Sequence, residues 1–233
     1  MDLFILFQAL EEAVFVIATW VIFLPKTFLQ TVFRPNWIYP YINSEWKKEP
    51  EKRFDDYLSP VVYWVIAGVL PLTYLYLVTD FPVKENTPIV LDPVHFYSNT
   101  LFALVGPIIY LAWIETLNNK PLKKSTLRRQ FLIQCYIFGS VQLIFAIAYG
   151  WFWFFPTKVL LWLAGVSEQI AMSVSVIPVI FEFIAILLLI VNEMLVFRAE
   201  LNISLLRACA PSLAPFLLIY IVLFLLILLL TPA

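Results

Sequence analysis

Two glutamates interrupt the apolar stretch of residues 172–197, which is long enough to cross a bilayer. Glu193 follows Glu182 by eleven residues, or three helical turns plus about 20°, so both carboxyl groups lie on one face of a helix, about 16 Å apart. A carboxyl group is costly inside hydrocarbon, and such a residue marks a candidate functional site. The chemistry that this pair offers is hydrogen bonding or proton relay within the membrane.

Other polar side chains could complete this site. Asn192 lies beside Glu193, and Gln142 lies in a second apolar stretch, residues 131–155. None of the five long apolar stretches of the chain contains Lys or Arg. Glu182 is therefore expected to form a hydrogen bond with a polar side chain such as Gln142, or with a backbone carbonyl that Pro178 leaves without its helical partner. Two interpretations stay open. The carboxyl group holds the bundle together or faces a partner subunit, or it relays a proton or a substrate.

The sequence offers little for catalysis or metal binding. It contains one histidine, so every site that needs two histidines from one chain is excluded. His95 lies three residues after Asp92, and these two side chains are weak candidates for part of a metal site. No phosphate-binding glycine loop, serine elbow or CxxC pair occurs. The sequence therefore predicts a protein that is not an enzyme and needs no cofactor.

The composition predicts an integral membrane protein. Hydrophobic residues make up 62% of the 233 residues and charged residues 13%, with a mean hydropathy of +0.89, whereas about a quarter of the residues in soluble proteins are charged. Five stretches approach or exceed the length that a membrane-spanning helix needs, and none alternates as the strands of a barrel do. The predicted fold is all-α, a polytopic bundle of five transmembrane helices at residues 58–79, 97–114, 131–155, 172–197 and 213–231.

The fifteen Lys and Arg residues predict the orientation, because cytoplasmic loops collect positive charge. The segments before, between and after the five spans contain six, one, five, one, two and zero of them, in chain order. This alternation places the basic N-terminal segment in the cytoplasm and Ala233 outside. The expected location is the cytoplasmic membrane of a bacterium.

Residues 1–57 are expected to form a region of their own ahead of the transmembrane domain of residues 58–233. The apolar run between Glu12 and Lys26 has thirteen residues, which is short for a span, and a narrow polar stripe follows one side of the helix. The pattern favours an amphipathic helix in the membrane interface, while a crossing helix stays open. The rest of the region is expected to be a juxtamembrane connector with its aromatic residues at headgroup level.

One segment, residues 118–130, is basic and contains no acidic residue. Its five cations could contact anionic lipid headgroups, at about 1 kcal/mol per charge, or they could serve the topology alone. By contrast, the run KKEPEKRFDD in the connector is nearly neutral, which argues against binding of nucleic acid. The candidates for contact with lipid headgroups are Lys120, Lys123, Lys124, Arg128 and Arg129.

Several short segments together resemble the Yip-domain family, especially its prokaryotic five-span members. They are FLPKTFLQTVFRPN, YLSPVVYWVIAGVLP, STLRRQFLIQCYIFGSV and FRAELNISLLRACAPSL. The resemblance implies a five-helix membrane domain without known catalytic chemistry. Eukaryotic members are linked to vesicle traffic and small GTPases through a soluble N-terminal region, and they carry an aspartate-leucine-tyrosine-glycine-proline signature. Since this chain shows neither feature, the resemblance implies no GTPase partner and no binding residue here.

The expected function is that of a non-catalytic protein that organises membrane or binds other membrane proteins, alone or as an accessory subunit of a larger complex. Its expected partners are membrane lipids and either a membrane protein or a second copy of the chain. The alternative is a small permease with a proton or substrate path past Glu182. An intramembrane enzyme would need a second acid, a metal or a cofactor near Glu182, and the sequence shows none.

Overall fold

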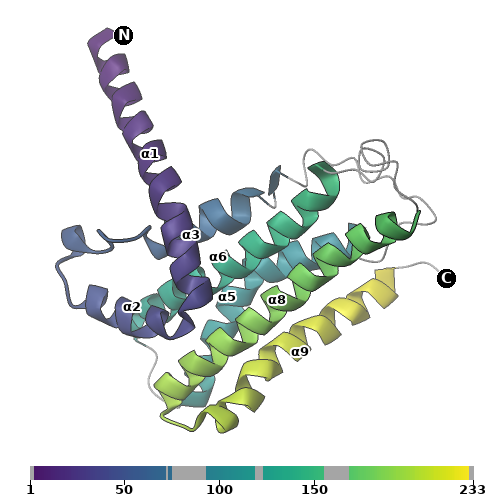
Figure 1. The fold of residues 1–233 in the computed structure, drawn as a ribbon. Coiled ribbons are helices and arrows are strands. Elements are labelled where there is room, and N and C mark those ends of the chain that lie inside the picture. Colours follow the sequence, from purple (N-terminus) through teal and green to yellow (C-terminus); the bar gives the residue numbers. More distant parts are fainter. Residues whose placement is uncertain (1–2, 72, 75–92, 119–122, 155–167, 231–233) are drawn as a thin grey trace.

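The computed structural model describes residues 3–71, 73–74, 93–118, 123–154 and 168–230 of the chain (Figure 1). Every element assigned in these ranges is a helix. The predicted all-α bundle is therefore confirmed for the described part of the chain.

The bundle is built around the helix α6, Lys124–Phe154. Every side chain from Leu132 to Gln142 is buried, as expected of a helix that is apolar on all sides and has neighbours on all sides. Those neighbours are α1 (Leu3–Phe33), α2 (Ile38–Trp46), α3 (Pro60–Trp64), the π-helical turn η3 (Val65–Val69), α5 (Pro93–Asn118) and α8 (Glu168–Leu201), while α9 (Leu205–Leu230) packs on α8 and α5.

Side-chain contacts fix the directions of the helices around α6. Tyr136 donates a hydrogen bond to the carbonyl of Leu58, and Ser140, one turn further on, bonds to Tyr63, so α3 runs parallel to α6. Arg129 pairs with Glu200 near the end of α8, so α8 runs antiparallel. The connections richest in Lys and Arg therefore meet at one end of the bundle. We call this end, formed by α2, the start of α6 and the turn between α8 and α9, the basic end (Figure 1).

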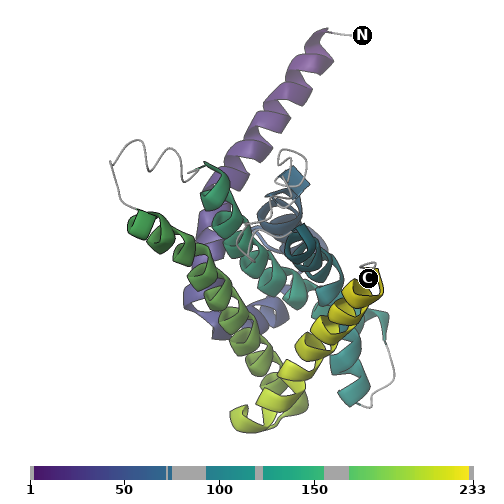
Figure 2. The ribbon, with the colours of Figure 1, turned by 90° about the vertical axis from the view of Figure 1, so that its right-hand side faces the viewer.

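A tight turn joins α8 to α9 at the basic end. Asn202, directly after α8, has a φ of 53°, the left-handed conformation that asparagine tolerates and that often ends a helix. Two residues later the carbonyl of Ser204 accepts the first backbone hydrogen bond of α9, from Ala208 at 3.0 Å. The turn reverses the chain, so that α9 lies beside α8 and runs in the opposite direction (Figures 1 and 2).

Gly139 lets α3 and α6 approach each other closely. A Cβ atom at this position would lie 2.8 Å from two ring atoms of Tyr63 and 3.2 Å from the Cα of Trp64. Small residues commonly allow such contacts between membrane helices. The α3–α6 contact therefore has no room for a larger residue at position 139.

We expect Gly139→Ala to destabilise the folded protein by about 1–3 kcal/mol, because the added methyl group must push two packed helices apart. Thermal unfolding in detergent measures the change. Ile147→Ala, on the exposed face of the same helix, is the control and should shift the unfolding temperature little. An unfolding temperature of Gly139→Ala equal to that of the wild type would contradict the close contact.

Three helices of the described residues are long and apolar enough to cross a membrane, namely Phe7–Phe33, Lys124–Ala148 and Val179–Leu201. The last two match the predicted spans at residues 131–155 and 172–197. The first lies in α1 (Leu3–Phe33), which continues through Pro25 as one helix. α1 is therefore longer than the thirteen-residue run before Lys26, and its length and composition would allow it to cross a membrane. Its position in the membrane interface stays a prediction.

α1 projects away from the bundle over most of its length (Figures 1 and 2). Each side chain from Phe7 to Ala18 is exposed. Its C-terminal part is fastened to the connector, since Lys26 Nζ donates to the carbonyl of Asp56 at 2.7 Å and the amide of Leu58 donates to Thr27 Oγ1 at 3.3 Å. One end of α1 is thus held by the bundle, and the rest has no cover among the described residues.

The connector after α1 packs into the bundle. Ile38 and Ile42 of α2 belong to the same hydrophobic core as the buried residues of α6. Trp37 stacks on Tyr41 with ring centroids 4.5 Å apart, and its ring lies 5.5 Å from that of Tyr136 in α6. The boundary expected at residue 57 therefore does not separate two hydrophobic cores.

Some expectations fall outside the described residues. Asp92 and Lys120 are not described, and His95 lies in α5 without a described side chain. The predicted spans at 58–79 and 213–231 overlap shorter apolar helices of the described residues, Pro60–Val69 and Leu205–Leu218. α5 covers the predicted span at 97–114.

Candidate functional site

The two glutamates of α8 lie in different environments. Glu193 is completely buried, and its Oε2 accepts a hydrogen bond from Gln134 Nε2 of α6 at 3.2 Å. Glu182 is partly exposed. The fully buried carboxyl group of the pair is therefore the one nearer the basic end.

Gln142, the polar side chain expected near Glu182, and its neighbour Ser140 are packed between α6 and the α3–η3 segment. Ser140 bonds to the hydroxyl of Tyr63 at 2.8 Å. Gln142 is buried and occupies the space beside Gly68, where any Cβ would collide with its amide group. Both side chains thus help to join α6 to the α3–η3 segment.

Asn192 is buried on α8 next to Glu193. Its Nδ2 donates to the carbonyl of Leu188 at 2.8 Å, while its Oδ1 has no hydrogen-bond partner among the described residues. One turn of a helix has about 3.6 residues, so Asn192 and Glu193 point about 100° apart. They therefore belong to different faces of α8.

Several buried polar residues were not predicted. Gln134 interrupts the apolar run FLIQCYIF of α6, and this interruption was the signal that could have identified it. Gln130 and Glu115 are also buried, but the sequence shows no pattern that separates them from surface residues near helix ends. Among the residues that the structure describes, no group of three His, Cys, Asp or Glu could hold a metal ion.

The predicted lipid-binding cations take two different roles. Arg129 joins three elements, because Nη2 pairs with Glu200 of α8 at 2.7 Å and Nη1 donates to Asn43 of α2 at 3.0 Å. Lys123, Lys124 and Arg128 are exposed. Arg129 therefore holds the basic end together, and Lys123, Lys124 and Arg128 remain the candidates for contact with lipid headgroups.

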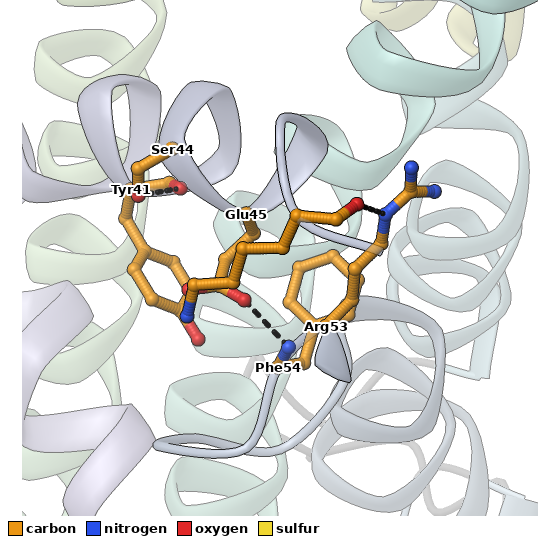
Figure 3. A network of polar contacts seen from close by, with 6 residues as sticks. Tyr41, Ser44, Glu45, Arg53 and Phe54 are labelled. Atoms are coloured by element: carbon orange, nitrogen blue, oxygen red, sulfur yellow. Dashed lines mark hydrogen bonds and ion pairs between the residues drawn. The ribbon is translucent and has the colours of Figure 1, made fainter. Parts of the chain in front are cut away.

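A second polar network folds the connector beside the basic end (Figure 3). The Glu45 carboxylate is buried; it accepts the amide of Phe54 at 2.7 Å and pairs with Lys48 at 2.6 Å. Ser44 donates to the carbonyl of Tyr41, and Arg53 Nε donates to the carbonyl of Lys48. These bonds hold the part of the connector that follows α2 against that helix.

Two tyrosines of α2 stay neutral at neutral pH. Burial raises the pKa of Tyr41, and the negative charges of Glu45 and Asp56 raise it further. Burial, followed by the charge of Glu200, raises the pKa of Tyr39. Since the ordinary pKa of tyrosine is already about 10, both hydroxyl groups are uncharged at neutral pH.

Comparison with known protein families, curated proteins and solved structures gives no match for this chain. The resemblance to the Yip-domain family therefore stays a prediction. What the geometry offers is a membrane-capable helical bundle, with buried polar contacts between its helices, a basic end and an apolar helix that projects from it.

Proposed function

We propose that this protein is a non-catalytic integral membrane protein that binds another membrane protein or a second copy of itself through α1. It would thereby organise membrane or act as an accessory subunit of a larger complex. The observation that carries the proposal is the exposure of an apolar helix that also bears two carboxylates, Glu11 and Glu12.

The position of these carboxylates calls for a partner. Lys26 is anchored at the connector, and Glu12 lies fourteen residues earlier in the same helix, or about 21 Å along its axis. If α1 crosses the membrane from this anchor, both glutamates lie within the hydrocarbon layer, which is about 30 Å thick. Charged groups at such depth almost always face protein or water. A polar or basic partner helix would supply that contact.

The proposed arrangement has five further spans, in α3–η3, α5, α6, α8 and α9, with the basic end in the cytoplasm and Ala233 outside. The meeting of the basic connections at one end supports it. The proposed location is the cytoplasmic membrane of a bacterium. The resemblance to prokaryotic Yip-like proteins suggests a five-helix domain, which would correspond to the five spans that follow α1.

Native mass spectrometry of the protein, extracted mildly from its own membrane, tests the proposal. We expect a complex of defined stoichiometry, and we expect the double variant Glu11→Gln, Glu12→Gln to reduce its abundance about tenfold, which corresponds to about 1.4 kcal/mol. Glu49→Gln with Glu51→Gln makes the same chemical change at exposed residues of the connector and should leave the complex intact. A wild-type chain that is always monomeric and free of protein partners would refute the proposal.

A small permease is the second candidate, favoured by the buried carboxyl group of Glu193. A path would pass Glu182 and continue toward Glu193 and the amide of Gln134. Flux into liposomes that is abolished by Glu182→Gln in a folded protein would support it. A monomeric protein without such flux would contradict both candidates.

A further inference from the structure

Glu193 and Gln134 meet in the interior of the bundle, where α8 packs against α6. Both residues are 0% exposed. Gln134 Nε2 donates a hydrogen bond to Glu193 Oε2 at 3.2 Å. The second oxygen of each group, Gln134 Oε1 and Glu193 Oε1, has no hydrogen-bond partner in the described part of the chain. Two acceptors are thus left over in one buried pair of side chains.

These two oxygens cannot be paired from outside the protein. Both atoms are closed off from water-sized molecules, so neither solvent nor a ligand reaches them. Buried polar atoms are nearly always paired, and leaving one unpaired is costly. The missing donor therefore has to belong to the pair itself or to a neighbouring side chain.

The neighbouring side chains do not supply this donor. Tyr110 of α5 is the one titratable side chain of another helix, among the described residues, that lies within electrostatic reach of Glu193. Its hydroxyl donates to the carbonyl of Ser212 at 3.0 Å instead. Gln130 lies one turn before Gln134 on α6, and its Nε2 donates to no described residue. The two oxygens are therefore left to each other.

No described cation stabilises Glu193 as a carboxylate. None of the ion pairs of the described residues includes it. Arg129, the cation nearest to Gln134 along α6, pairs with Glu200, and Arg198, the cation that follows Glu193 in α8, is exposed. Burial without a cation is far more costly for a carboxylate than for the neutral acid. The surroundings therefore favour the protonated form.

From this arrangement we infer that Glu193 binds a proton and forms a two-point hydrogen bond with the side-chain amide of Gln134. The proton lies on Glu193 Oε1 and is donated to Gln134 Oε1, while Gln134 Nε2 donates to Glu193 Oε2. A carboxylic acid and a primary amide complement each other in this way, because each has a donor beside an acceptor. The proton comes from water and is enclosed when α8 packs against α6. Both leftover oxygens are then joined by a single proton.

This proton site joins two helices that are long and apolar enough to cross a membrane, α6 and α8. Loss of the proton would place a negative charge opposite Gln134 Oε1 and remove half of the bond, so the contact between the two helices depends on the proton. A permease path through Glu193 would have to open this bond. The inference concerns a different site from α1 and does not depend on the proposed partner.

Infrared spectroscopy of the full-length protein in lipid bilayers tests the inference. At neutral pH a solvated glutamate is ionised, since its ordinary pKa is about 4.3. The difference spectrum between the wild type and Glu193→Gln should nevertheless contain the C=O band of one carboxylic acid. Glutamine can keep both hydrogen bonds, because its NH₂ group replaces the O–H donor, so this variant should fold. Carboxylate bands in place of the acid band would overturn the inference.

Glu49→Gln is the matched control, because it makes the same change at an exposed glutamate of the connector. Its difference spectrum should contain carboxylate bands and no acid band. An acid band of equal size in this control would show that the band does not report on the contact between α6 and α8, and it would overturn the assignment to Glu193.

Gln134→Leu tests the second point of the bond. Without the amide, the acid C=O loses its N–H donor, so the acid band should move to higher frequency. Gln142→Leu, at another buried glutamine of α6 that packs beside Gly68, should leave the band in place. If Gln134→Leu fails to fold, the wild-type band decides, because an acid bonded at both oxygens absorbs at lower frequency than a free acid. An unmoved band in Gln134→Leu, or a wild-type band at the frequency of a free acid, would overturn the pairing with Gln134.

Discussion

Replacing Arg129 by methionine is expected to destabilise the folded protein by about 2–3 kcal/mol. The side chain of Glu200 is 6% exposed, and that of Arg129 22%. Removal of the guanidinium leaves the carboxylate buried without its cation, which costs more than the intact pair contributes. The partial exposure of Arg129 places the expected effect below that of a fully buried pair. Chemical unfolding in detergent, monitored by tryptophan fluorescence, measures it.

A double-mutant cycle separates the ion pair from other effects. Arg129→Met combined with Glu200→Gln should recover much of the lost stability, because no unpaired charge remains. Arg128→Met, at the exposed neighbour, is the matched control and should cost little. If Arg129→Met were as stable as Arg128→Met, Arg129 would not hold the basic end together as described.

Replacing Glu45 by alanine is expected to release the connector at a cost of about 2–3 kcal/mol, because a buried carboxylate with two charge-assisted hydrogen bonds is lost. The amide of Phe54 would lose its acceptor. Phe54 also has a φ of 66°, an unfavourable conformation for a bulky residue, and the bond from Glu45 holds it there. Limited proteolysis within residues 47–56 should become faster.

The exposed pair in the same connector is the control. Glu49 and Lys52 lie 2.8 Å apart with side chains more than two-thirds exposed, so Glu49→Ala should change stability by less than about 1 kcal/mol. Equal proteolysis rates for Glu45→Ala and Glu49→Ala would show that the buried carboxylate does not hold the connector.

The helical class and the approximate places of α6 and α8 were predictable, because membrane spans depend on a simple excess of apolar residues. The meeting of the basic connections at one end followed from charge counting. The apolar part of α1 is longer than the thirteen residues counted before Lys26, since proline usually ends or kinks a helix in water but is tolerated in apolar helices.

The candidate site was less predictable than the fold. The helical angle correctly groups Glu182 with Glu193 on one face of α8, but burial depends on which neighbour lies opposite. Gln134 of α6 meets Glu193, and this pairing follows from the register of two packed helices, which apolar sequences do not encode by periodicity. The unpaired oxygen of Asn192 depends on packing in the same way.

Photo-crosslinking in the native membrane, from a reactive amino acid at Phe15, tests the central proposal most directly. Phe15 is 72% exposed on α1, three residues after Glu12. The account predicts one defined protein adduct that disappears with Glu11→Gln, Glu12→Gln, while the same probe at Phe183, an exposed residue of α8, gives lipid adducts. Lipid adducts alone at Phe15 would contradict the proposal that α1 binds a membrane-protein partner.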